Sequence, residues 1–309
     1  MEQTNFNLIF FQNGLGQKRT GIEKTVQELA DHYSDKQVEG SDKQKSNKKF
    51  DTNIYFVSNT GNLKQNLANL YSINYDLMIL GNNKTNTNKP NINIGGDHSM
   101  GIGSVGASLN KYGPDIKVIW IDAHADINTR TSSPSGNVHG MPLSFLTGLD
   151  SSADYDYLYN KLPFVNLCYI GIRDLDTEEI EIIKKYNIKT ISVKDFNNDI
   201  NTTITNIINW VDCSPVHVSF DVDSLDPTYI QYTGTRASGG LELEQLIQFI
   251  KNICLNTNVI NFDLSELNLY NPDCVEMSGD EKIKSFENFN LVLETICSSL
   301  NDKSLKCKL

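Results

Sequence analysis

The chain has 309 residues, of which 39% are hydrophobic and 21% are charged, and its formal net charge at pH 7 is −11. This composition is typical of a globular protein and argues against a disordered chain or a fibre. The acidic balance also argues against a nucleic-acid partner, which needs a basic surface patch. An acidic surface could attract a cationic substrate, although solubility is the simpler explanation of the charge.

Neither a membrane span nor an export signal is predicted. No run reaches the roughly 18 apolar residues of a transmembrane helix, and the short apolar start Leu8–Phe11 has no basic flank. Six cysteines are scattered without a CxxC pair, at Cys168, Cys213, Cys254, Cys274, Cys297 and Cys307. Such cysteines in a protein of this size indicate reduced thiols, so we expect a cytoplasmic protein without a membrane partner.

Short apolar runs alternate along the chain with longer stretches of helical period. The runs predicted as strands are Leu8–Phe11, Ile54–Val57, Met78–Leu80, Ile92–Ile94, Val118–Ile121, Leu167–Ile170, Thr190–Val193, Val216–Phe220 and Val259–Phe262. Helices are expected at Thr177–Tyr186, Glu242–Ile253 and around Phe289–Leu300. Strands with helix-length connections predict a three-layer α/β/α fold, in which helices cover both faces of a central, mainly parallel sheet.

The whole chain, residues 1–309, is predicted to form a single domain. Two stretches, 34–49 and 82–91, are rich in Lys, Asn, Ser and Gln and almost free of large apolar residues. We therefore expect them to be surface loops rather than domain boundaries.

Three segments place polar side chains directly after an apolar strand, where open parallel sheets bind their ligands. They are Gly95–Ser99 (GGDHS), Asp122–Asp126 (DAHAD) and Asp221–Pro227 (DVDSLDP). Asp122, His124 and Asp126 are spaced by two residues, so an extended backbone would point all three to one face. The pattern indicates a metal site, although DAHAD taken alone could also be a solvated polar loop.

The candidate ligands comprise two imidazoles and four carboxylates. They are His98, His124, Asp122, Asp126, Asp221 and Asp223. Carboxylates buried side by side without a cation would be costly, and an oxygen-rich site with imidazole and no thiolate suits Mn²⁺ better than zinc or copper. Four carboxylates balance two divalent cations, and a bridging hydroxide would leave one net negative charge, complementary to a guanidinium.

Six motifs together resemble the ureohydrolase superfamily, and within it the arginases. They are GGDHS, IDAHADIN, SGNVHG, GIRDLD, SFDVDSLDP and TGTRASGGL, which follow the order and approximate spacing of that family from about Gly14 to Leu269. The resemblance implies two Mn²⁺ per subunit and hydrolysis of L-arginine to L-ornithine and urea, with a metal-bridging hydroxide attacking the guanidinium carbon. It also implies a homotrimer.

The resemblance further implies how the amino-acid head of the substrate is held. Asn128, Ser135 and Asn137 match residues that hold the α-carboxylate, and short amide and hydroxyl side chains are suited to donate hydrogen bonds to an anion. These residues lie in the loop that separates arginases from enzymes acting on agmatine, which has no carboxylate. The alternative for the Thr131–Asn137 segment alone is an ordinary polar turn.

The acidic residues of a second segment are expected to bind the α-ammonium group of the substrate. Asp176 matches the residue of the family that receives it, with Asp174 and Glu179 as supporting or water-mediated partners. Taken alone, an acidic run of this kind is more often a helix N-terminus, where carboxylates offset the helix dipole.

The remaining assignments concern the chemical step. His139 matches the proton-shuttle histidine of the family, and the neutral-range pKa of imidazole suits proton delivery to the leaving amine. Glu266 matches the glutamate that orients the guanidinium, and Thr235 matches a residue near it. Asp126 is expected to accept and relay the proton of the hydroxide, in addition to being a ligand.

Two alternatives stay open at this stage. An agmatinase-like enzyme acting on another guanidino compound would share the metal motifs, and an inactive family member could serve as a binding subunit. The second alternative is weakened because all six predicted ligands are present. Three features depart from the family: Arg236 stands where many arginases carry proline, Val26 and Gln27 replace a proline usual near the N-terminus, and the segment from Asn271 to Leu309 has little recognisable match.

Overall fold

The computed structural model describes residues 6–34, 52–84, 89–150, 153–274 and 276–306 of the chain. The strands in this part are β1 (Asn7–Phe11), β2 (Asn53–Val57), β3 (Asn91–Ile94), β4 (Lys117–Ile121), β5 (Leu167–Ile170), β6 (Lys189–Ile191), β7 (Pro215–Asp221) and β8 (Asn258–Ser265). They form one eight-stranded sheet in the order β2-β1-β3-β8-β7-β4-β5-β6, and every neighbouring pair is parallel. The predicted parallel α/β sheet is confirmed.

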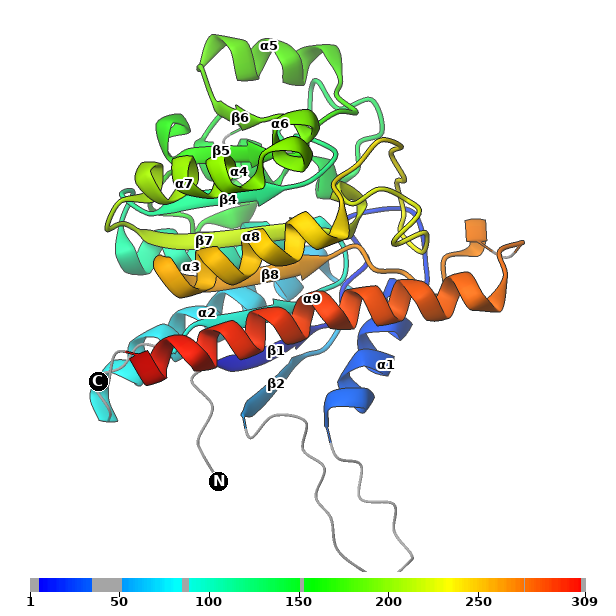
Figure 1. The fold of residues 1–309 in the computed structure, drawn as a ribbon, viewed down its shortest axis with the longest axis horizontal. Coiled ribbons are helices and arrows are strands. Elements are labelled where there is room, and N and C mark those ends of the chain that lie inside the picture. The colour runs from blue at the N-terminus through cyan, green and yellow to red at the C-terminus, as the bar shows by residue number, and fades with distance from the viewer. Residues whose placement is uncertain (1–5, 35–51, 85–88, 151–152, 275, 307–309) are drawn as a thin grey trace, which may run out of the picture.

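Helices cover both faces of this sheet (Figure 1). They are α1 (Ile22–Tyr33), α2 (Leu63–Lys84), α3 (Gly101–Tyr112), α4 (Pro142–Thr147), α5 (Thr177–Lys185), α6 (Val193–Asn198), α7 (Ile200–Val211), α8 (Leu243–Asn256) and α9 (Gly279–Lys306). One hydrophobic core includes residues of α1, α6, α7, α8 and α9, and a second includes residues of α2, α3 and α4. This arrangement confirms the predicted three-layer α/β/α class. In the described ranges, no helix has the length and apolar character to cross a membrane.

Strand β4 shows why its sequence is apolar throughout. Successive side chains of a strand point to opposite faces of the sheet, and both faces are covered here. Val118 and Trp120 therefore pack into the core beneath α2, α3 and α4, whereas Ile119 and Ile121 pack into the core on the other face. All four side chains are fully buried.

One strand prediction was wrong, because Met78–Leu80 lies inside helix α2. The described buried residues of this helix include Leu67, Leu70, Asn74 and Met78. Their spacings of three and four are the period of a helix face. A short apolar run does not distinguish a strand from a buried helix turn unless the residues three and four positions away are also considered.

Two other differences concern where elements begin and end. The run Thr190–Val193 stops as a strand at Ile191, because the side chain of Ser192 caps α6 by accepting a hydrogen bond from the backbone N–H of Asp195. Helix α9 extends well beyond both ends of the predicted Phe289–Leu300. Its first turn contains two acidic residues, which favour a helix N-terminus.

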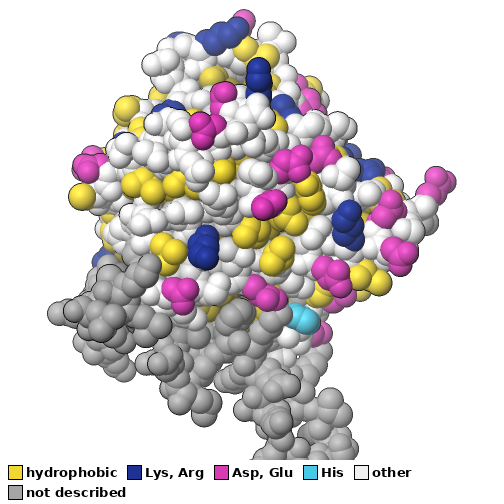
Figure 2. Space-filling model, viewed as in Figure 1, with side chains coloured by type: hydrophobic (Ala, Val, Ile, Leu, Met, Phe, Trp, Pro, Cys, Tyr) yellow, Lys and Arg dark blue, Asp and Glu magenta, His cyan; other side chains and the backbone are white. Residues whose placement is uncertain are grey.

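The surface predictions are only partly covered by the structure. Most of the two polar stretches, 34–49 and 82–91, lies outside the described residues, although α2 extends into the second as far as Lys84. The prediction of a surface loop is wrong at Asn91, which begins β3 and is fully buried. Figure 2 shows the face that carries α8 and α9, where acidic side chains are spread among basic and hydrophobic ones. This spread agrees with solubility as an explanation of the net charge.

The order of strands brings the polar motifs together. Strands β3, β8, β7 and β4 are consecutive in the sheet, and each is parallel to its neighbour. Their carboxyl ends therefore lie along one edge, where GGDHS follows β3, DAHAD follows β4 and DVDSLDP begins at the last residue of β7. Glu266 follows β8 directly. Segments far apart in the sequence thus meet at one site, as open parallel sheets allow.

The loop after β3 packs so closely against the loop after β1 that no side chain fits at Gly96. A Cβ atom at Gly96 would lie 1.5 Å from the backbone oxygen of Asn13, so the backbone would have to move. We expect Gly96→Ala to lower the free energy of unfolding by roughly 3 kcal/mol in urea denaturation. Gly279→Ala is the control, because no atom lies within 4 Å of its Cβ position. Equal stability of the two variants would contradict this packing.

Candidate metal centre and active site

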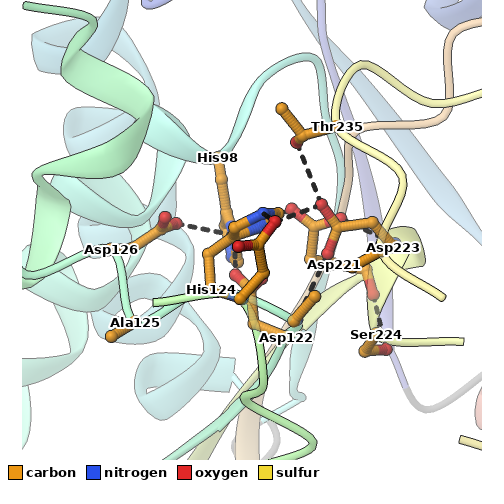
Figure 3. A network of polar contacts seen from close by, with 12 residues as sticks. His98, Asp122, His124, Ala125, Asp126, Asp221, Asp223, Ser224 and Thr235 are labelled. Carbon is orange, nitrogen blue, oxygen red and sulfur yellow. Dashed lines mark hydrogen bonds and ion pairs between the residues drawn. The ribbon is translucent and has the colours of Figure 1, made fainter. Parts of the chain in front are cut away.

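The structure brings the six predicted metal ligands together, pointing toward one another (Figure 3). His98 Nδ1 faces three carboxylates, with distances of 2.9 Å to Asp122 Oδ2, 3.1 Å to Asp126 Oδ2 and 3.2 Å to Asp221 Oδ2. His98 is almost completely buried. Around one divalent cation with bonds of roughly 2.0–2.2 Å, neighbouring ligand atoms lie about 3 Å apart. The spacing around His98 therefore fits a cation.

A second group adjoins the first through a shared residue. His124 Nδ1 lies 3.2 Å from Asp223 Oδ2 and 3.4 Å from Asp122 Oδ1. Asp122 thus presents one oxygen to each imidazole, and it belongs to both groups of potential ligands. A carboxylate that serves two groups can bridge two cations a few ångström apart. The donor set fits a pair of divalent cations.

The electrostatics of the cluster favour positive charge at its centre. Burial raises the pKa values of Asp221 and Asp223, and the neighbouring carboxylates raise them further. Burial opposes protonation of His98 and His124, yet the surrounding carboxylates raise both pKa values well above the ordinary range. All these shifts reflect the same excess of buried negative charge, which two divalent cations would balance.

Several groups behind the cluster fix the ring of His98. Its Nε2 lies 2.9 Å from the Ser219 hydroxyl, and the Trp120 ring stacks on it with centroids 4.0 Å apart. Trp120 Nε1 also donates a hydrogen bond of 3.0 Å to Asp122 Oδ2. Such contacts orient a ligating imidazole so that one nitrogen faces the metal. Neither Ser219 nor Trp120 was assigned a role from the sequence.

The predicted substrate residues largely surround one cavity of about 210 Å³, which is room for a small molecule. The predicted residues that line it are His98, His124, Asp126, Asn128, Ser135, His139, Asp174, Asp176, Glu179, Asp221 and Thr235. Asn137 and Glu266 are not among the residues that line it. Thr235 also donates a hydrogen bond of 3.1 Å to Asp223 Oδ2, which connects its loop to the metal cluster.

His139, which is partly buried and lines the cavity, forms a pair with the buried Glu266. His139 Nδ1 lies 3.0 Å from Glu266 Oε1, and the carboxylate is only 1% exposed. Burial alone would lower the pKa of His139, but the neighbouring Glu266 carboxylate raises it to about 9. Glu266 lies at a positive φ of 67°, and Asp126 at 50°, which few residues with side chains adopt. Two site carboxylates are thus held in a strained backbone conformation.

The two sides of the predicted head-binding site are adjacent. Asn128 Nδ2 donates a hydrogen bond of 2.8 Å to Asp176 Oδ2. Asp176 is the N-cap of α5, and its backbone N–H donates to Glu179 Oε2. The helix-terminus interpretation of the acidic run is therefore correct, and the same residues also line the cavity. Asp174 is largely exposed, and its Oδ2 lies 3.7 Å from His124 Nε2.

Arg173 connects the loops of the site in a way that sequence reasoning missed. Its guanidinium donates to backbone carbonyls in the loops that follow two strands, to Gly171 after β5 and to Asp223 and Ala237 after β7. Burial lowers the pKa of Arg173 although nearby carboxylates oppose this. The residue stands inside the GIRDLD motif, but nothing in a single sequence indicates that its partners are main-chain oxygens far along the chain.

Comparison with known proteins gives consistent similarities. A family model described as Arginase family matches residues 11–273. The arginase of Eremothecium gossypii is 39% identical over 184 residues, which cover 57% of this chain and 46% of that protein. The arginase of Saccharomyces cerevisiae is 39% identical over 188 residues, covering 57% of this chain and 56% of that protein. The matched part spans about half the length of these relatives.

The likeness in structure extends further along the chain. A crystal structure of Entamoeba histolytica arginase in complex with L-ornithine has a TM-score of 0.75 and 26% sequence identity to this chain. That superposition covers 96% of this chain and 98% of the other. The shared architecture therefore includes regions in which the sequences of the relatives above do not align.

The shared position of Asp122 predicts unequal effects of removing ligands. In protein loaded with Mn²⁺, we expect Asp122→Ala to lose both ions, because this residue serves both groups. Asp223→Ala should keep about one ion per chain, since the group around His98 does not require it. Elemental analysis measures the number of Mn²⁺ ions per chain, and Asp176→Asn is a control outside both groups. Full metal retention by Asp122→Ala would contradict the assignment.

Proposed function

The chain belongs to the arginase family, and we propose that it hydrolyses L-arginine to L-ornithine and urea at a centre that binds two Mn²⁺ ions. One observation carries the proposal: two groups of imidazole and carboxylate ligands share Asp122 and adjoin a small cavity. The rim of that cavity offers both hydrogen-bond donors and carboxylates. This combination suits a zwitterionic amino acid with a cationic side chain.

The proposed ligand sets follow the two groups. His98, Asp122, Asp126 and Asp221 would hold one ion, and His124, Asp122 and Asp223 would hold the other. When bound, the pair of cations would lower the pKa of water toward neutrality and so supply a nucleophile for the guanidinium carbon. Asp126 stays assigned to accepting and relaying the proton of that nucleophile.

His139 is suited to protonate the leaving amine. Its Nδ1 is engaged by Glu266, so Nε2 is the nitrogen left to exchange a proton with the substrate. The Glu266 carboxylate raises the pKa of His139, which favours the protonated ring that a general acid requires. We propose that ornithine leaves as His139 delivers this proton.

Glu266 is proposed to serve both His139 and the guanidinium. Its Oε1 accepts hydrogen bonds from His139 Nδ1 and from the backbone N–H of His98. Within the described part of the chain, Oε2 accepts a hydrogen bond only from Gln17 Nε2, at 2.8 Å. Oε2 is therefore the oxygen with capacity left for a guanidinium N–H.

The α-carboxylate of arginine is proposed to bind Asn128, and its α-ammonium group is proposed to bind Asp176. An α-carboxylate and an α-ammonium group share one carbon, so the groups that bind them must lie close together. The amide of Asn128 and the carboxylate of Asp176 meet this requirement at 2.8 Å. Ser135, which lines the same cavity, and Asn137 are proposed to hold the α-carboxylate together with Asn128. Asp174 and Glu179 are proposed as supporting or water-mediated partners of the α-ammonium group.

Turnover of arginine and agmatine, measured side by side as urea release with added Mn²⁺, tests the substrate. We expect arginine to be preferred, because agmatine has no carboxylate for Asn128 to hold. Asn128→Ala should raise the KM for arginine by about tenfold or more, the scale of one hydrogen bond to a charged group. The same change should leave agmatine turnover nearly unaltered. A wild-type preference for agmatine would contradict the proposal.

The role of His139 is tested by its replacement. His139→Ala should lower kcat by roughly 10²–10⁴, the scale of a lost general acid, with a smaller effect on KM. His32→Ala is the matched control, because His32 is an exposed residue of α1 whose ring contacts Tyr33 and Phe286 rather than the site. An unchanged kcat in His139→Ala would remove this residue from the mechanism.

A further inference from the structure

The segment between β1 and α1 touches the active site, although no motif assigned it a function. The backbone N–H of Gly16 donates a hydrogen bond of 2.7 Å to the buried carboxylate of Asp97. The backbone oxygen of Gly16 accepts one of 3.1 Å from the N–H of His139. A Cβ atom at Gly16 would lie 2.5 Å from Asp97 Oδ1, so there is no room for a side chain. This segment is therefore fixed closely against His139.

The next residue, Gln17, reaches the partner of His139. Its Nε2 donates a hydrogen bond of 2.8 Å to Glu266 Oε2, across 249 positions of sequence. Glutamine is mostly exposed in proteins, but Gln17 is only 8% exposed. Its Oε1 is buried and has no hydrogen-bond partner among the described residues. Burying an amide whose oxygen has no hydrogen-bond partner is unfavourable. We therefore expect the hydrogen bond that the amide nitrogen donates to Glu266 to have a function.

The function concerns the rotation of the Glu266 carboxylate about the last bond of its side chain. The terminal torsion of a glutamate side chain has a broad, roughly two-fold preference, so it is set by external partners. His98 N–H and His139 Nδ1 both engage Oε1 of Glu266, and Gln17 engages Oε2. With a donor on each oxygen, the carboxylate plane is fixed. Without Gln17, only one oxygen is held.

We propose that Gln17 is a positioning residue of the reaction, which acts through Glu266 on His139 and on the bound guanidinium. Together with Gly16, it holds His139 at two points: the backbone N–H directly, and the imidazole through Glu266. The inference rests on the proposed function, since it assumes that these residues act on arginine.

Gln17→Leu tests the inference, because leucine is similar in size and has no donor. We expect kcat for arginine to fall by about 10- to 100-fold, the scale of a small misplacement of catalytic groups. The affinity for L-ornithine, which has no guanidinium, and the Mn²⁺ content should stay at wild-type values. Gln17→Glu should also lower kcat, because a carboxylate cannot donate to Glu266.

Gln12→Leu is the matched control. It makes the same change in the same segment, but Gln12 Nε2 binds Gln27 Oε1 on α1 rather than the site. A loss of kcat shared by Gln12→Leu, or a wild-type kcat in Gln17→Leu, would overturn the inference. A loss of stability without a change in kcat per folded enzyme would also overturn it.

Crystal structures of the Mn²⁺-loaded wild type and Gln17→Leu separate this inference from the proposed function. We expect the plane of the Glu266 carboxylate to turn in the variant, so that Oε2 leaves the position at which Gln17 holds it in the wild type. If wild type releases no urea from arginine but the carboxylate turns, the proposed function fails and the positioning by Gln17 stands. If wild type is active and Glu266 keeps its position with an unchanged kcat in the variant, only this inference fails.

Discussion

Burying four carboxylates beside one another is unfavourable unless positive charge lies among them. In this chain the four are joined by two imidazoles at one edge of a parallel sheet, and all but His124 are buried. The order β3-β8-β7-β4 is what brings them together, because each strand ends at the same edge. The positive φ at Asp126 and Glu266 is a cost that the surrounding packing must support. The demand for cations therefore follows from the fold.

Around this cluster, contacts from distant segments fix the groups that would meet the substrate. Arg173 binds backbone oxygens of the loops after β5 and β7, and Ser219 with Trp120 holds the ring of His98. Ser219 also lies 3.3 Å from the fully buried Asp263, which is paired with His217. These contacts orient the metal-facing side chains and hold the loops around the cavity in place.

The sequence predicts which polar residues cluster at this edge of the sheet, because ligand chemistry restricts both residue type and spacing. Aspartate and histidine at alternate positions after an apolar strand leave a local pattern, and His98, Asp122 and Asp223 lie where it indicates. Gln17 belongs to no such local pattern, because its partner Glu266 is 249 residues away. The error at Met78–Leu80 has a different reason, because a run of three apolar residues does not by itself distinguish a strand from a turn of a buried helix. The predicted fold class rested on many apolar runs together, so one wrong strand did not change it.

The central claim is that this buried cluster exists to bind two divalent cations. A ligand that binds only the native state raises the temperature of unfolding as its concentration rises. The most direct measurement is thermal unfolding of metal-stripped wild-type protein during titration with Mn²⁺, with calorimetry to count the ions bound. We expect the unfolding midpoint to rise and binding to saturate at two ions per chain. An unchanged midpoint and no measurable binding of Mn²⁺ would contradict the claim.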